Sequence, residues 1–300
     1  MSADQMSMDR RAFLGGLSST LLMLAGCRDS RDITVGSKNF TEQLVLGELL
    51  AQMLEAAGVT PVDRRFYLAG TYICQQALLA GRIDMYVEYT GTALAAVLKE
   101  KPSSNPAEVL ETVKREYERR FNLQVMPPLG FDNSFAIVMR GEDARRAHVQ
   151  TLSQLAGVAP KLRLGVGYEF MERPDGYPGL VSTYGLKFAE APRVMDLGLL
   201  YRALESRQVD VAVGSNTDGL IAALGLVVLE DDKHYFPPYE AVPIVRRETL
   251  ERHPQVRQVL LRLAGRISAE DMRQMNYAVD GEKKDAAEVV KNFIQAKKLK

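Results

Sequence analysis

The sequence predicts an α/β fold in which short strands alternate with helices. Three observations lead to this prediction. Short runs rich in β-branched residues are separated by stretches whose apolar residues recur with helical spacing. Turns rich in polar residues follow several of these runs, and 46% of the 300 residues are hydrophobic, which is enough for a substantial core. Because strands joined through helices usually pair in parallel, we expect mainly parallel sheets.

The first strand is ITVG, residues 33–36, and an amphipathic helix follows it. The apolar residues of this helix recur at i, i+3, i+4, i+7 and i+8, which places them on one face: Leu46, Leu49, Leu50, Met53 and Leu54. Gly58 marks the end of the helix. Further strands are predicted at residues 62–68, 83–87, 134–139, 162–167, 209–214, 226–229 and 241–246.

The last sixty residues have helical patterns and few strand signals. Near the end, one apolar stripe is formed by Ala286, Val289, Val290, Phe293 and Ile294. We interpret this stripe as a face that docks against the body of the protein rather than as a partner site.

The N-terminal residues have the layout of an export signal and not of a folded element. Arg10 and Arg11 precede a short apolar run, which ends in Leu-Ala-Gly-Cys at residues 24–27. A charged start and an apolar run too short to span a bilayer are typical of signal sequences. The ending resembles the bacterial lipoprotein box, which implies removal of residues 1–26 and lipid attachment to Cys27. The double arginine also resembles a twin-arginine signal, with Sec export as the alternative.

Charge and cysteine content narrow the class further. The chain has 38 basic and 38 acidic residues, so it shows no electrostatic footprint for nucleic acid. If Cys27 carries lipid, Cys74 has no partner for an internal disulfide, and we expect it to be a small core residue. No later segment approaches eighteen apolar residues, so the predicted mature protein is a soluble body tethered by its lipid.

Polar and aromatic residues gather at five predicted strand-to-helix turns: residues 36–43, 88–92, 130–135, 169–180 and 214–220. In an open parallel sheet such turns meet at the carboxyl edge, where ligands bind. The turn at 88–92 reads Glu-Tyr-Thr-Gly-Thr, and either threonine would suit a helix cap. Tyr89 has no such role in the turn, which leaves packing or a binding site as its purpose.

The sequence offers no catalytic or metal-binding motif. Its three histidines are scattered, and it lacks a His or Cys pair at metal-ligand spacing, a G-x-S-x-G elbow and a phosphate-binding loop. Glu88, Asp175 and Asp218 lie in the turn clusters, but no telling spacing pairs them. The sequence therefore predicts a protein that captures a molecule rather than converts it, with no metal and no cofactor.

Seven segments, in order, resemble the OpuAC-like substrate-binding proteins of osmoprotectant ABC importers, which bind glycine betaine, choline, carnitine and related quaternary amines. The segments are GSKNFTEQLVLGELLAQML, AGTYICQQALLAGRIDMYVEYTGTAL, GFDNSFAI, YEFMERPDGYPGLVSTYGLKF, SNTDGLI, FPPYEAVPIVR and MNYAVDGEKKDAAEVVKNFI. The resemblance spans about residues 32 to 296. It implies a two-lobe periplasmic-binding fold of type II, whose two chain crossovers form a hinge. Lobe one would hold residues 31–133 and 240–300, and lobe two residues 134–239.

The resemblance also implies the function and the walls of the site. The protein would capture a quaternary amine outside the cytoplasm, on the periplasmic or cell-surface side of the membrane, and deliver it to an ABC permease with its ATPase subunits. A trimethylammonium group donates no hydrogen bond, so proteins select it by apolar shape and by aromatic faces. Carried over by motif, Tyr89, Phe135 and Tyr239 are the walls of an aromatic box.

Three further positions match those that hold the ligand's carboxylate in the family: Lys38, Thr92 and Arg173. An arginine can do so with two charge-assisted hydrogen bonds. Two positions depart from the family pattern. Phe135 lacks the hydroxyl of the tyrosine often found there, and Ser215 stands where many relatives have an aromatic residue. A box that lacks one wall predicts weaker or different binding; candidates to fill the gap are Tyr67, Tyr72 and Tyr184.

Two alternatives remain at this point. The first keeps the fold and changes the ligand to an amino acid or another small zwitterion, because Ser215 replaces an aromatic wall. The second is an enzyme on the same two-lobe scaffold, which the absence of a nucleophile–base pair disfavours.

Overall fold

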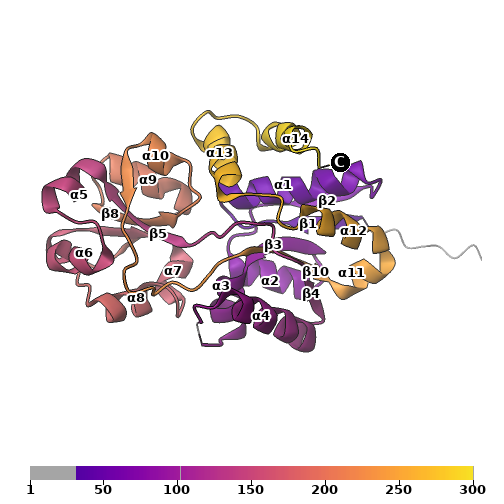
Figure 1. Cartoon of the computed structure of the whole chain (residues 1–300), viewed down its shortest axis with the longest axis horizontal. Helices are drawn as coiled ribbons and strands as arrows, with labels where there is room; N and C mark the ends of the chain where they lie inside the picture. The colour runs from indigo at the N-terminus through magenta and orange to yellow at the C-terminus, as the bar shows by residue number, and fades with distance from the viewer. Residues whose placement is uncertain (1–31, 102, 300) are drawn as a thin grey trace, which may run out of the picture. The chain divides into compact units, whose positions relative to one another are not determined.

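A computed structural model of the protein describes residues 32–101 and 103–299. The protein is built around two five-stranded sheets (Figure 1). The first sheet has the order β2-β1-β3-β10-β4, and the second has the order β7-β6-β8-β5-β9. We call the parts built around these sheets the first and the second lobe. The strands of the first are β1 (Ile33–Gly36), β2 (Val62–Arg65), β3 (Met85–Tyr89), β4 (Leu123–Val125) and β10 (Ala241–Arg246). Those of the second are β5 (Phe135–Arg140), β6 (Leu164–Val166), β7 (Arg193–Val194), β8 (Val211–Ser215) and β9 (Leu226–Val228).

Helices fill most connections between the strands. The first lobe contains α1 (Thr41–Ala56), α2 (Thr71–Leu79), α3 (Thr90–Thr92), a π-helical segment η1 (Ala93–Leu98) and α4 (Pro106–Phe121). The second contains α5 (Gly141–Ala147), α6 (Leu152–Val158), the 3-10 turn η2 (Ala159–Lys161), α7 (Tyr168–Glu172), α8 (Tyr177–Tyr184), α9 (Leu197–Glu205) and α10 (Leu220–Ala223). After β10 come α11 (Arg247–Arg252), α12 (Pro254–Leu263), α13 (Ala269–Asp280) and α14 (Ala286–Ala296).

All the predicted strands overlap observed strands, but the prediction of mainly parallel sheets is wrong. Among the described strands, β1 pairs in parallel with β2 and β3, and β6 pairs in parallel with β7 and β8. The other four pairs are antiparallel, and each contains β5 or β10. These two strands follow the crossovers, so each enters its sheet from the other lobe instead of after a helical return, which would set it parallel.

The chain crosses between the lobes twice, from β4 to β5 and from β9 to β10 (Figure 1). The two crossovers run antiparallel and are joined by hydrogen bonds. The Asn133 amide donates to the carbonyl of Tyr239 at 3.0 Å, and the Ala241 amide donates to the carbonyl of Phe131 at 3.1 Å. The family resemblance implies two chain crossovers, which the structure has; the hydrogen bonds between them are an additional finding.

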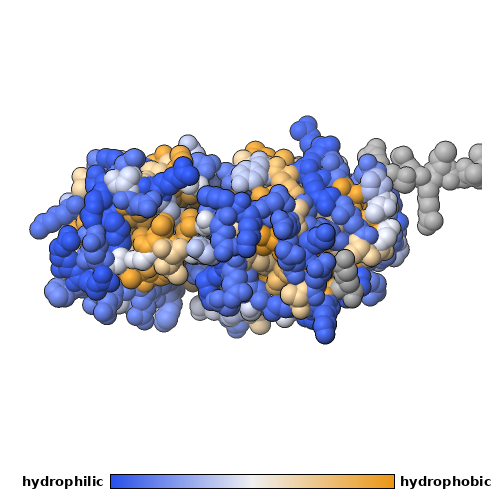
Figure 2. Space-filling model, turned by 90° about the horizontal axis from the view of Figure 1, so that it is seen from above, coloured by the Kyte–Doolittle hydropathy of each residue, from blue (hydrophilic) through white to orange (hydrophobic). Residues whose placement is uncertain are grey.

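The core of the first lobe confirms both apolar stripes expected from the sequence. Leu46, Leu49, Leu50 and Leu54 of α1 are fully buried. The α14 residues Val289, Val290 and Ile294 belong to the same apolar cluster, and α14 packs directly on α1. Burying each such side chain stabilises the fold by roughly 1.5–3 kcal/mol. The face drawn in Figure 2 is mostly hydrophilic, in keeping with helices that turn their apolar stripes inward.

Two features of the predicted N-terminus, the signal and the lipidated Cys27, lie outside the described residues. Within residues 32–101 and 103–299, no helix is both long and apolar enough to cross a membrane. The same ranges contain no cluster of three or more histidine, cysteine or acidic residues arranged to hold a metal ion. Cys74 is buried, as expected for a core residue, and it forms no disulfide with any residue that the structure describes.

Candidate functional site

The candidate site lies where β3 of the first lobe and β5 of the second meet the crossovers. Tyr89 is the last residue of β3 and stands opposite Ala241, which directly follows the second crossover. Phe135 is the first residue of β5 and stands opposite Ser215, the last residue of β8. The strand ends therefore bring together residues that lie far apart in the sequence.

Tyr89 lies between two charged groups. Its side chain is buried, and the amino group of Lys38 stands 4.9 Å from the centre of its ring. Lys38 also forms an ion pair with Glu88, whose second carboxylate oxygen accepts a hydrogen bond from Tyr86 at 2.9 Å. The predicted site residue Thr92 is buried on α3, one turn after Tyr89. The charge of Lys38 is thus balanced inside the protein.

Glu42, on α1, accepts hydrogen bonds from residues of both lobes. The Tyr89 hydroxyl donates to one carboxylate oxygen at 2.6 Å, and the side-chain amide of Asn133 donates to the same oxygen. The Thr217 hydroxyl and the Asn276 amide donate to the other oxygen. Burial raises the pKa of Glu42, and these four donors oppose that rise. Glu42 lies in one of the polar turn clusters, but its role depends on contacts that the sequence alone does not reveal.

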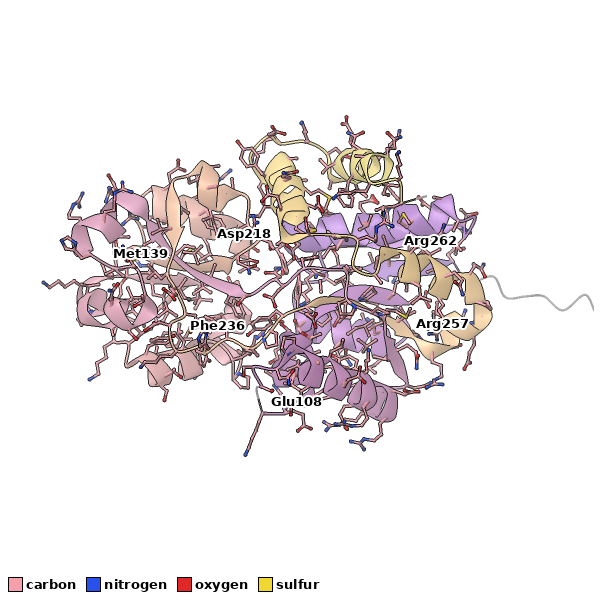
Figure 3. The ribbon with its side chains drawn as sticks, viewed as in Figure 1. Glu108, Met139, Asp218, Phe236, Arg257 and Arg262 are labelled. Carbon is pink, nitrogen blue, oxygen red and sulfur yellow. The ribbon has the colours of Figure 1, made fainter. Side chains whose placement is uncertain are left out.

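An aromatic cluster surrounds Phe135. The ring of Phe135 meets that of Tyr239 edge to face, with centroids 5.5 Å apart. The ring centroids of Phe170 and Phe236 lie 4.9 and 5.5 Å from the ring centroid of Phe135. Figure 3 labels Phe236, which lies on the second crossover. Beside Tyr239, the rings that pack against Phe135 are therefore these two phenylalanines, and no contact of this kind involves Tyr67, Tyr72 or Tyr184 among the described residues. No local pattern in the sequence distinguishes Phe170 or Phe236.

Arg173 places a cation over two rings of this cluster. Its guanidinium carbon is 5.0 Å from the centre of Phe135 and 5.9 Å from that of Tyr239. The same guanidinium forms a two-point ion pair with Asp175, and the Nε–Oδ1 distance is 2.9 Å. Tyr239 donates its hydroxyl to Asp175 at 2.7 Å. Burial alone would lower the pKa of Arg173, but the bonds to Asp175 raise it above its usual value.

Ser215 and Asp218 form a polar corner beside the aromatic cluster. The Ser215 hydroxyl donates to the side-chain oxygen of Asn133. Asp218, which is labelled in Figure 3, accepts hydrogen bonds from the Ser215 amide at 2.9 Å and from the Tyr201 hydroxyl. Both partners belong to the second lobe, so Asp218 holds a turn within that lobe. Burial raises its pKa to about 7.

Gly91 allows the second crossover to approach α3 closely. A Cβ atom on Gly91 would lie 2.7 Å from the Pro238 carbonyl oxygen and 2.8 Å from the ring of Tyr239. Only glycine has room for this approach. Among the predicted site residues, Lys38 lies over the ring of Tyr89, and Arg173 lies over the rings of Phe135 and Tyr239. Ser215 stands opposite Phe135 in the sheet, and Thr92 is buried next to Gly91 in the chain.

Comparison with known proteins gives consistent matches along the chain. The family model described as the substrate binding domain of ABC-type glycine betaine transport systems matches residues 31–296. A carnitine transport binding protein of Listeria monocytogenes is 34% identical over 281 residues, which are 93% of this chain and 91% of that protein. A glycine-betaine-binding protein of Pseudomonas aeruginosa is 32% identical over 286 residues, which are 91% of this chain and 90% of that protein.

Solved structures agree with the sequence comparison. The crystal structure of a glycine betaine/carnitine/choline ABC transporter protein superposes with a TM-score of 0.73 at 33% identity, covering 89% of this chain and 99% of that chain. An apo glycine betaine-binding protein of Escherichia coli has a TM-score of 0.64 at 28% identity and covers 90% and 99% of the two chains.

Proposed function

Because the chain belongs to the OpuAC family of substrate-binding proteins and has its two-lobe, type II periplasmic-binding fold, we propose that it captures a quaternary amine and delivers it to an ABC permease. Members of this family are substrate-binding proteins of transporters, so the chain is a binding protein and not an enzyme. Glycine betaine, choline and similar amines are the proposed ligands.

One observation carries this proposal: a delocalised cation, the Arg173 guanidinium, already lies over the rings of Phe135 and Tyr239. The site therefore has aromatic faces arranged to attract positive charge. Each such face attracts a cation by roughly 0.5–2 kcal/mol, depending on how far water is excluded. A trimethylammonium group gains from these faces without needing a hydrogen-bond acceptor.

In the proposed site, Tyr89, Phe135 and Tyr239 are the aromatic walls. The polar part is supplied by Lys38, Thr92, Arg173 and Ser215. We also propose that the first lobe comprises about residues 31–133 and 240–300, and the second lobe residues 134–239. The two lobes would close over the ligand by rotating about the paired crossovers.

The proposed location is outside the cytoplasmic membrane, where lipid on Cys27 anchors the protein. The lipobox-like Leu-Ala-Gly-Cys sequence at residues 24–27 supports this. Metabolic labelling with a fatty acid tests it: the wild type should carry label in the membrane fraction, and Cys27→Ser should not. Label retained by the variant would exclude Cys27 as the anchor.

Isothermal titration of the folded protein tests the ligand class. Glycine betaine, choline, carnitine and proline betaine are the ligands to compare, with 3,3-dimethylbutanol as an uncharged control of similar shape to choline. We expect saturable heat with at least one amine and none with the control. If folded protein gives no heat with any of the four, the quaternary-amine proposal is wrong.

An amino acid or another small zwitterion is the second candidate, because Ser215 with Asn133 makes one side of the site polar. Tyr89→Ala separates the two candidates. The variant should lose most of its affinity for a quaternary amine, whereas recognition built on Arg173 should be only slightly weakened.

A further inference from the structure

We infer that the site prefers a ligand of net positive charge, a choline-type amine without a carboxylate, to zwitterionic betaines. The inference rests on the proposed function, because it concerns the same site and narrows the ligand to a charge class. It comes from the pairing of the charged side chains that the lobes bury together.

Both cations available to a ligand carboxylate already hold a carboxylate of the protein. Lys38 is paired with Glu88, which is fully buried. Arg173 is paired with Asp175, which is 1% exposed and also held by the Tyr239 hydroxyl. Arg173 and Lys38 have further N–H donors, but a ligand carboxylate could reach them only beside the carboxylate that each already binds. Two carboxylates on one cation repel each other, which weakens the gain from a charged ligand group.

Glu42 is a buried carboxylate that forms no ion pair with any described residue. Within residues 32–101 and 103–299, the most deeply buried charged side chains are Lys38, Glu42, Glu48, Glu88, Glu116, Arg140, Arg173 and Asp175. Each of these except Glu42 takes part in an ion pair. Glu42 is held by two side-chain amides and two hydroxyls, and amide N–H groups can only donate. Burial raises the pKa of Glu42 and these donors oppose that rise, so a cation bound nearby would favour its ionised form.

With Glu42 ionised, these groups give the site an excess of one negative charge, to which Asp218 beside Ser215 adds when it loses its proton. Lys38 and Arg173 are two cations, and Glu42, Glu88 and Asp175 are three carboxylates. A betaine adds a positive and a negative charge and leaves the excess unchanged. A choline-type cation removes it, and its ammonium group finds the faces of Tyr89, Phe135 and Tyr239 nearby. Electrostatic complementarity of this kind governs which partner is accepted.

Paired titrations with choline and glycine betaine test the inference, since the two ligands share a trimethylammonium group and differ in the carboxylate. We expect choline to bind at least about ten-fold more tightly, which corresponds to 1.4 kcal/mol. Glycine betaine binding equally well or better would overturn the inference and leave the proposed function intact. If no quaternary amine binds in these titrations, the proposed function itself is wrong.

Glu42→Gln removes the excess charge while keeping the side chain's size. Choline affinity should fall about ten-fold or more, and glycine betaine affinity should change much less, so that the ratio of the two moves toward one. A merely structural role for Glu42 would weaken both ligands equally and leave the ratio unchanged. Glu48→Gln is the matched control, because Glu48 lies on the same helix but is paired with Arg64.

Asp175→Asn provides a test in the opposite direction, which is independent of whether Glu42→Gln folds. The substitution keeps an acceptor for Tyr239 but frees the charge of Arg173. Glycine betaine affinity should rise relative to choline by about five-fold or more, since a guanidinium binds a carboxylate strongly. An unchanged preference in this variant would contradict the inference.

Discussion

At the scale of single residues, Tyr89 combines two roles that can be separated by substitution. Its ring faces the Lys38 amino group, and its hydroxyl donates to Glu42. The ring is the part expected to attract a ligand, whereas the hydroxyl positions the carboxylate. Phenylalanine at this position would keep the first role and lose the second.

Tyr89→Ala is expected to lower quaternary-amine affinity by about ten-fold or more, because an aromatic wall contributes up to about 2 kcal/mol. Tyr89→Phe should lose less, since the ring face remains. Titration calorimetry measures both, and thermal melts verify that each variant is folded. An alanine variant with wild-type affinity would show that Tyr89 only packs.

Asp218 is expected to make stability depend on pH. Its pKa is about 7 in the folded protein, against an ordinary value of 3.8. Between these values the folded state holds a proton that the unfolded state has released, so the stability contributed by this group falls as pH rises from about 4 to 7. Above that range the contribution is constant.

Asp218→Asn should remove this component. Melting temperatures of the two proteins should differ little at pH 4.5, and the wild type should lose more than the variant between pH 5 and 8. The difference between the two curves isolates Asp218 from other titrating groups. Parallel curves would show that Asp218 is ionised in the folded state across this range.

Only part of the candidate site can be predicted from the sequence, for a physical reason. Tyr89 and Phe135 lie in predicted polar turns, and together with Tyr239 they match the aromatic positions of the family. Glu42 was not singled out, because its donors Thr217 and Asn276 are 175 and 234 residues away in the chain. Only the packing of the two lobes brings such residues together.

At the scale of elements, α3 and the second crossover are in close contact at Gly91. The backbone of Pro238 and the ring of Tyr239 occupy the space that a side chain at Gly91 would need. The Thr90 amide also donates to the carbonyl of Glu240 at 3.0 Å, which ties the same two elements together. The position of one aromatic wall is therefore set by a glycine in the neighbouring element.

Gly91→Ala should displace Tyr239 and lower ligand affinity about ten-fold, with a loss of stability of roughly 1–3 kcal/mol from overpacking. Calorimetry and urea unfolding measure the two effects. Gly157→Ala is the matched control: Gly157 lies in α6 and a Cβ there meets no atom within 4 Å, so the control should keep wild-type affinity. Normal affinity in Gly91→Ala would mean that the contact is not needed for binding.

The elements themselves were largely predictable, and the errors concern their context. Apolar residues that recur about every 3.6 residues located α1, and the longer strands were located from their β-branched runs. β4 and β7 have only three and two residues, which is too short for any such pattern. Strand direction was misjudged because periodicity is the same for parallel and antiparallel strands. Direction depends on where the chain comes from, and β5 and β10 come from the other lobe.

At the scale of the whole molecule, side chains from the two lobes meet directly. Thr217 of the second lobe donates to Glu42, and Asn276 donates to the Thr217 carbonyl at 3.0 Å. On the other side, the Tyr72 amide of α2 donates to Glu169 of α7. These contacts favour a closed arrangement of the lobes.

Thr217→Val should weaken the closed arrangement and lower the affinity for every ligand by a similar factor, up to about ten-fold for a lost hydrogen bond to a charged group. Small-angle X-ray scattering should show a larger radius of gyration without ligand. Thr249→Val is the control, because Thr249 bonds to Asp84 within the first lobe and should affect stability alone. Equal scattering and affinity for wild type and Thr217→Val would exclude a role in closure.

The two-lobe plan followed from a family resemblance, but the contacts that hold the lobes together did not. Residue patterns report which side chains are buried, and they carry little information on which distant surfaces meet. The ion pair between Arg173 and Asp175 was not predicted either, although the two residues are close in sequence. In a solvent-exposed turn both side chains would be free to bind a ligand, and the sequence pattern does not reveal that this turn is buried.

The hydrogen-bonded pairing of the two crossovers has a consequence for how opening can be observed. Two strands that are bonded to each other bend and twist together, and they resist sliding past one another. Rotation of the lobes should then follow a single path. If so, the separation of just one pair of spin labels, with one label on each lobe, reports the full course of the motion.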